Sequence, residues 1–177
     1  MADLFFRVIT NLGDGLAVTL IALLFLIWKT GNGLLLGISG IFAGVFTQIL
    51  KHTVFSTWER PKKFFEGVHE LYLVSGVNNY SGHTFPSGHS ASAFALYFSI
   101  ALLTPNKPLK FLLFLLALTV AFSRVYLSQH FLNDVYAGSL LGMCSVFLAR
   151  YILQRMKPFA GAAWINKGLF SINKPAA

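Results

Sequence analysis

The chain has 177 residues, of which 55% are hydrophobic and only 11% are charged, and its mean hydropathy is +0.65. These values exclude an ordinary water-soluble globular protein of this size. The 14 basic and 6 acidic residues give a net charge of +8, which in a soluble protein would indicate a nucleic-acid partner. Because most of the charges lie between long apolar runs, we interpret the chain as a multi-pass membrane protein that binds no nucleic acid.

Five segments are, or nearly are, long and apolar enough to cross a bilayer as helices, which takes about 20 residues. They cover residues 15–28, 33–50, 90–104, 109–122 and 131–151. Turn signals at residues 30–32 and 105–108 make short connections, so the spans on either side of each should be antiparallel neighbours. The sequence predicts one all-α domain, residues 1–177, folded as a polytopic transmembrane helix bundle.

The two ends of the chain differ from the spans. Residues 1–13 are too short to cross and lack the basic start, apolar centre and cleavage site of a signal peptide. We expect an interfacial helix there, or the remnant of a preceding span. Residues 157–177 form a basic tail with Trp164 and Phe170, which we expect to be a cytoplasmic end, interfacial or disordered.

Alternating spans would sort the charged residues onto two faces of the membrane. The face with the long polar insert, residues 52–89, receives six bases and all six acids, whereas the other receives eight bases and no acid. Because cytoplasmic loops are enriched in Lys and Arg, the second face should be cytoplasmic and the insert should be outside. The eight bases are Lys29, Lys107, Lys110, Arg150, Arg155, Lys157, Lys167 and Lys174.

Glycines recur at three- and four-residue steps in two of the spans. This spacing brings helix backbones into close contact in membrane proteins. We therefore expect helix packing, rather than substrate gating, to be the role of Gly33, Gly37, Gly40, Gly44, Gly138 and Gly142.

The third predicted span opens with Pro86-Ser87-Gly88-His89 at the outer face. Pro is favoured at a first helical position, and the N–H groups that follow it have no intrahelical acceptor. Ser87, Gly88 and His89 can therefore form a cradle for a tetrahedral anion at the positive end of the helix dipole. Taken alone, a helix that is simply capped by Thr84 or Ser87 explains the same residues.

Three cations, Lys51, Arg60 and Arg124, lie at the same face. Guanidinium forks match phosphate oxygens in pairs, and Lys acts as a movable point charge. The alternative is that such cations anchor the protein to lipid headgroups. That alternative fits Lys62 and Lys63 better than Arg124, because Arg124 lies between two apolar stretches.

His130 and Asp134 are four residues apart, a spacing that places side chains on one face of a helix. A carboxylate can hold one imidazole nitrogen protonated and leave the other free to attack. A purely structural His–Asp pair is the alternative. His89, beside the proposed cradle, is the candidate acid for a leaving oxygen.

The sequence contains no obvious ligand set for a metal. Cys144 is the only cysteine, so it forms neither an internal disulfide nor a thiolate pair. A two-histidine zinc pattern and an acidic calcium loop are also missing. We therefore expect no metal and no other cofactor, and cationic side chains alone would stabilise a phosphoryl transition state.

Together these residues resemble the type 2 phosphatidic acid phosphatase (PAP2) superfamily, a group that includes membrane lipid phosphatases. The second motif of that family is intact as Pro86-Ser87-Gly88-His89. The third, Ser-Arg, five residues, His, three residues, Asp, is intact as Ser123-Arg124, His130 and Asp134. Two intact motifs in order, each at a membrane boundary, form a specific signal.

The first motif departs from the family pattern, because eight residues rather than the usual six separate Lys51 from Arg60-Pro61. Thr53 stands where the usual spacing would place Lys. At about 100° per residue, a nine-residue step puts two side chains on opposite faces of a helix. The helix must therefore end between Lys51 and Arg60 if both contact phosphate.

The resemblance implies that His130 attacks phosphorus to form a phosphohistidine, that Asp134 orients it and that His89 protonates the leaving alcohol. It also assigns the binding of phosphate oxygens to a set of five residues: Lys51, Arg60, Ser87, Gly88 and Arg124. The family fold has six transmembrane helices, so five spans imply that the first helix is absent or strongly altered here. In the insert, residues 64–72 are compatible with an amphipathic interfacial helix that either floors a lipid entrance or merely covers the bundle.

The residues and the resemblance together indicate an integral membrane phosphatase that releases phosphate from a lipid phosphate monoester or diphosphate at the outer leaflet. The compact chain resembles bacterial members, which implies a cytoplasmic (inner) membrane with the site facing the periplasm or exterior. Candidate substrates are undecaprenyl diphosphate, phosphatidylglycerophosphate, phosphatidate and a lipid A phosphate. A lipid phosphotransferase and a non-enzymatic lipid-binding or channel protein are the alternatives, and the sequence leaves the oligomeric state open.

Overall fold

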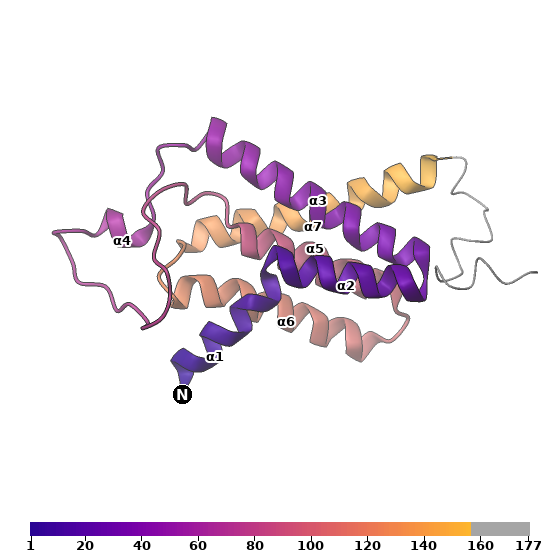
Figure 1. Ribbon diagram of the computed structural model, residues 1–177, viewed down its shortest axis with the longest axis horizontal. Helices are drawn as coiled ribbons and strands as arrows, with labels where there is room; N and C mark the ends of the chain where they lie inside the picture. The colour runs from indigo at the N-terminus through magenta and orange to yellow at the C-terminus, as the bar shows by residue number, and fades with distance from the viewer. Residues whose placement is uncertain (157–177) are drawn as a thin grey trace, which may run out of the picture.

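The computed structural model describes residues 1–156, which fold almost entirely into helices (Figure 1). In chain order the elements are α1 Ala2–Ile9, the 3₁₀ helix η1 Thr10–Gly13, α2 Gly15–Trp28, α3 Thr30–Thr53, α4 Pro61–Phe64, α5 Gly88–Leu103, α6 Lys107–Tyr126 and α7 Leu132–Arg155. The predicted all-α class is confirmed. The expected basic tail, residues 157–177, lies outside the described residues.

In the described part of the chain, three helices, α3, α6 and α7, are long and apolar enough to cross a membrane, and α5 is a shorter apolar helix of 16 residues. Residues 2–13 and 15–28 qualify as a span only when taken together, and the two parts are bent by 54°. Asp14 marks the break, since its backbone is extended and its carboxylate accepts the Leu16 N–H at 3.1 Å to start α2 afresh. All five predicted segments are helical, but the first belongs to a bent pair.

Helix α5 lies in the middle of the bundle and packs against α3, α6 and α7, while α2 packs on α3. Leu36 of α3, Leu96 of α5 and Val120 of α6 are fully buried in the shared core. The outward-facing side chains of these helices are mostly large and apolar, as expected for a surface in contact with lipid.

The predicted close approach of α7 to its neighbour is confirmed. A Cβ added to Gly138 would meet the carbonyl oxygen of Ser87, and one added to Gly142 would meet that of Ala91. The backbones of α7 and α5 therefore touch at the end of the bundle where both helices begin. This contact brings the Ser87 motif beside the first turn of α7.

Between α3 and α2 the packing prediction holds for only half of the glycines. A Cβ on Gly33 would meet the backbone of Leu26, and one on Gly40 would lie 2.7 Å from Val18 Cγ1. The prediction is wrong for Gly37 and Gly44, because a Cβ added to either would meet nothing within 4 Å.

The insert between α3 and α5 holds only the short helix α4, so the amphipathic helix predicted over residues 64–72 is wrong. Pro61 occupies the first turn of α4, and Gly67, with φ of +77°, turns the chain where the helix was expected to continue. Beyond this turn, the Tyr72 hydroxyl donates to the Asp3 carboxylate at 2.6 Å. Helix α1 thus fastens the insert to the bundle.

Figure 1 shows that the insert, the first turns of α5 and α7 and the last turns of α3 and α6 all lie at one end of the bundle. The short connections between α2 and α3 and between α5 and α6 lie at the opposite end. The antiparallel arrangement predicted from these connections is therefore confirmed, and the three sequence motifs meet at one end.

Candidate active site

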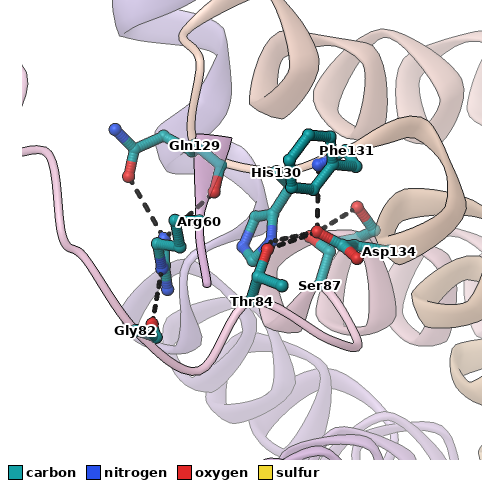
Figure 2. Close-up of polar contacts among 9 residues, drawn as sticks. Arg60, Gly82, Thr84, Ser87, Gln129, His130, Phe131 and Asp134 are labelled. Atoms are coloured by element: carbon teal, nitrogen blue, oxygen red, sulfur yellow. Dashed lines mark hydrogen bonds and ion pairs between the residues drawn. The ribbon is translucent and has the colours of Figure 1, made fainter. Parts of the chain in front are cut away.

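The centre of the site is the buried pair His130 and Asp134 (Figure 2). His130 Nδ1 lies 3.3 Å from Asp134 Oδ2. The four-residue spacing predicted that the two side chains stack on one face of a helix. This is wrong, because His130 precedes α7. The pairing comes from capping: Asp134 sits in the first turn of α7 and its Oδ2 accepts the backbone N–H of Phe131 at 2.9 Å.

Thr84 is a third member of this cluster that the sequence did not assign to the site. Its hydroxyl donates to Asp134 Oδ2 and lies 3.3 Å from His130 Nδ1. The Asp134 oxygen therefore faces three donors, which hold the carboxylate and direct the imidazole through Nδ1. The other ring nitrogen, Nε2, is left free of the carboxylate. The only sequence signal for Thr84 was its place two residues before Pro86.

Burial lowers the pKa of His130 and outweighs the hydrogen bond to Asp134, which raises it. The positive charges of Arg60, Lys51 and Arg124 lower the pKa of His130 further. The imidazole is therefore neutral near pH 7, and a neutral ring with Nδ1 protonated leaves a lone pair on Nε2. A nucleophile needs that lone pair.

Arg60 is held beside the histidine by backbone and side-chain oxygens (Figure 2). Its Nε donates to the Gly82 carbonyl at 3.0 Å, and its Nη1 lies 3.3 Å from both the carbonyl and the side-chain oxygen of Gln129. Gln129 is buried and in turn donates to the Asn79 side-chain oxygen. Burial lowers the pKa of Arg60 and the charge of Asp134 raises it, but a guanidinium remains charged throughout the physiological range.

Arg124 approaches the same cluster from the last turn of α6. The turn after α6 folds back on Arg124, because the backbone N–H groups of Gln129 and His130 both donate to the Arg124 carbonyl, at 2.9 and 3.2 Å. Its side chain is buried, and Nη1 donates to Thr10 Oγ1 at 2.8 Å. Its Nε is also buried but has no hydrogen-bond partner within residues 1–156.

Lys51 lies in the last turn of α3 and is buried at the same end of the bundle. Its charge lies within electrostatic range of Arg60, Arg124 and Asp134. Helix α3 stops at Thr53 and the chain turns before Arg60. The prediction that the helix ends between Lys51 and Arg60 is therefore confirmed, and both cations reach one site despite the altered spacing.

The start of α5 differs in detail from the prediction. Ser87, not Pro86, precedes the helix as its N-cap, and Ser87 Oγ accepts from the N–H and hydroxyl of Ser90 at 3.4 and 2.9 Å. The Ser87 N–H is also occupied, since it donates to the Asp134 carbonyl at 2.9 Å. The remaining first-turn donors, the N–H groups of Gly88 and His89, have no intrahelical acceptor, so two amides of the predicted anion cradle are left to donate.

The chain's similarity to known proteins agrees with this geometry. Residues 32–158 match the family model of the PAP2 superfamily. The chain belongs to the PAP2 superfamily. It is 33% identical over 167 residues to phosphatidylglycerophosphatase B of Bacillus subtilis, with 85% of this chain and 75% of that one covered. It is 30% identical over 146 residues to the lipid A 1-phosphatase of Rhizobium etli, with 77% and 59% covered.

Two solved structures share the PAP2 fold with this chain. LpxE of Aquifex aeolicus superposes with a TM-score of 0.69 at 25% identity, over 85% of this chain and 86% of the other. The phosphatidylglycerolphosphate phosphatase of Bacillus subtilis gives 0.66 at 28% identity, over 89% and 79%. The protein is thus a membrane phosphatase of the PAP2 superfamily, as its motifs predicted.

A pocket of about 440 Å³ adjoins the site of this PAP2 phosphatase. The rings of Trp58, Phe64 and Phe131 line it, and it reaches Thr84 and Asp134. Its exposed lining is mainly apolar, although Thr57, Glu59 and Asn133 also contribute to it, and this suits the apolar body of a ligand next to the polar cluster. Within residues 1–156, no group of three or more His, Cys, Asp or Glu side chains comes together to hold a metal ion.

Proposed function

We propose that this PAP2 phosphatase hydrolyses a lipid phosphate monoester or diphosphate at the outer leaflet through a phosphohistidine on His130. The observation that carries the proposal is the buried His130 imidazole, which faces Asp134 through Nδ1 and has the charges of Lys51, Arg60 and Arg124 around it. A neutral nucleophile set among fixed cations suits attack on an anionic phosphoryl group.

In the first step, Nε2 of His130 forms a bond to phosphorus while the bond from phosphorus to the lipid oxygen breaks. His89 enters this step as the imidazolium and gives its proton to that oxygen, so the lipid leaves as a neutral alcohol, or as a lipid phosphate if the substrate is a diphosphate. The Nδ1 proton of His130 stays on the Asp134 side, where the carboxylate stabilises the positive ring. In the second step, His89 accepts a proton from water as the water displaces phosphate from His130.

The cations and amides supply the binding of the phosphoryl oxygens. Lys51, Arg60 and Arg124 offset the negative charge of the group in transfer, and the Gly88 amide donates from the start of α5. Ser87 contributes through its position, because its hydroxyl and N–H already bind Ser90 and Asp134. This division of roles assigns catalysis to imidazoles and electrostatic stabilisation to fixed donors.

The proposal predicts release of inorganic phosphate by the purified protein in detergent or lipid from at least one of four lipid classes: undecaprenyl diphosphate, phosphatidylglycerophosphate, phosphatidate and a lipid A phosphate. Release should proceed at the same rate in EDTA, because no step uses a metal ion. The measurement is phosphate released per minute, with ¹⁸O-labelled water to show that water is the acceptor. Transfer of the phosphate to another lipid, or loss of activity in EDTA that a divalent ion restores, would contradict the mechanism.

We propose in addition that the site faces the outside of a bacterial cytoplasmic membrane, because the face opposite the insert carries the excess of bases. In a Cys144→Ala background, Asn78→Cys should react with an impermeant maleimide on intact cells. Lys107→Cys, which is also exposed but at the other end of the bundle, should react only after lysis. The reverse labelling pattern would show that the site is cytoplasmic.

A further inference from the structure

Thr10 lies at the bend between α1 and α2, where the N-terminal segment touches the site. It is buried, with 7% of its surface exposed, and its Oγ1 accepts a hydrogen bond from Arg124 Nη1 at 2.8 Å. The two residues are 114 positions apart. Among residues 1–156, this is the hydrogen bond that holds the Arg124 side chain, so the N-terminal segment determines how the guanidinium is turned.

The planar guanidinium has two edges on which a pair of N–H groups can bind a phosphate. One edge joins Nη1 and Nη2, and the other joins Nε and Nη2. Thr10 accepts from one of the two N–H groups on Nη1, and Nε has no hydrogen-bond partner within residues 1–156, so the Nε–Nη2 edge of Arg124 is available for a bidentate contact. Its Nε is buried without a partner in the described chain, and a buried N–H left unpaired in this way is costly unless a ligand oxygen satisfies it.

The contrast with Arg60 shows that this arrangement is specific. Arg60 donates through both Nε and Nη1 to protein oxygens, so its Nε–Nη2 edge is already in use. The acceptor on Arg124 is a neutral hydroxyl rather than a carboxylate. A hydroxyl fixes the orientation of a guanidinium without neutralising the charge that an anionic substrate would use.

Thr10 is itself held firmly on the two helices that carry the site. A Cβ on Gly13 would come within 2.8 Å of the His89 carbonyl oxygen and 2.6 Å of Val120, so η1 fits tightly between α5 and α6. The Tyr97 hydroxyl donates to the Leu12 carbonyl at 3.1 Å. The segment that carries Thr10 is therefore packed in a fixed place beside Arg124.

We propose that Thr10 is a positioning residue for catalysis: it holds Arg124 so that its Nε and Nη2 grip two oxygens of the phosphoryl group in transfer. The role deepens the proposed function and rests on it. It also gives residues 1–13 a part in the site, in addition to the interfacial helix predicted for them.

The test compares Thr10→Val, which keeps the shape but removes the acceptor, with Thr10→Ser, which keeps the acceptor. Thr19→Val is the matched control, because within residues 1–156 the Thr19 hydroxyl bonds only to the Gly15 carbonyl in its own helix. Hydrogen bonds to charged groups predict a fall of about tenfold or more in kcat for Thr10→Val, with KM little changed. Thr10→Ser and Thr19→Val should stay within about twofold of the wild type.

Orthovanadate provides a second measurement that needs no turnover. Vanadate should raise the thermal unfolding temperature of the wild type and of Thr10→Ser, and the rise should be clearly smaller for Thr10→Val. If Thr10→Val does not fold, Thr10→Ala takes its place against Thr10→Ser. Equal kcat values and equal vanadate shifts for the valine and serine variants would overturn the role of Thr10.

The two measurements separate this inference from the proposed function. A wild type that binds vanadate but releases no phosphate from any lipid would overturn the proposed function, while the vanadate shifts still decide the role of Thr10. An active wild type with an equally active Thr10→Val would overturn the role of Thr10 alone. A wild type that neither turns over nor binds vanadate would overturn both.

Discussion

Replacing His130 with alanine should lower phosphate release by a factor on the order of 10⁴ or more. The loss should be this large because the substitution removes the only buried imidazole that pairs with Asp134 in the described residues, and with it the nitrogen that forms the covalent bond. His69→Ala is the matched control, since His69 is exposed in the insert. It should stay within about twofold of the wild type.

The same pair of variants tests the covalent intermediate directly. With a substrate labelled on the transferable phosphate, a rapid quench in alkali should trap acid-labile phosphate on the wild type and on His69→Ala. His130→Ala and His130→Asn should trap none. Labelling that persists in either His130 variant would remove this residue as the nucleophile, and substantial phosphate release by His130→Ala would do the same.

The sequence predicted the parts of the site that depend on local chain geometry. Lys51, Arg60 and the start of α5 lie at helix ends, and helix ends are marked by hydropathy and by Pro, Gly and Ser. Alternation of the helices then brings these ends to one face of the bundle. The all-α class, the antiparallel connections and the meeting of three motifs therefore followed from the sequence.

The residues that the sequence missed are held by contacts between distant segments. Thr84 binds Asp134, Gln129 binds Arg60 and Thr10 binds Arg124 across 50, 69 and 114 positions. A lone Thr or Gln has no pattern that distinguishes a site residue from a helix cap or a loop residue. The residues that hold the site side chains in place can be recognised only once the bundle brings the segments together.

The errors in the predicted helices have local causes of a different kind. Over residues 64–72 the apolar and acidic pattern suited a helix, but Gly67 takes a positive φ and Tyr72 binds Asp3 of α1. At residues 14–15 an aspartate cap bends what otherwise qualifies as one span. In both places a backbone turn and a side-chain bond overrode the pattern of hydropathy.

Replacing His89 with glutamine should separate the two steps of the reaction, because the proposed roles of His89 differ between them. With a lipid phosphate monoester the leaving alkoxide is a poor leaving group and needs a proton, so release of the alcohol should fall by about 10²- to 10⁴-fold. Nitrophenolate leaves without a proton. His89→Gln should therefore release about one equivalent of nitrophenolate per site from p-nitrophenyl phosphate in a burst, as expected for a covalent intermediate.

After that burst His89→Gln should stall, because water attack on the phosphohistidine also uses His89 as a base. Stopped-flow absorbance measures the burst, and trapped acid-labile phosphate on His130 should rise together with it. His69→Gln should turn over both substrates like the wild type. Equal losses in the burst phase with the lipid and with the nitrophenyl ester would contradict proton donation by His89. They would show that His89 binds phosphate or supports the fold, since only proton donation depends on how well the leaving group carries charge.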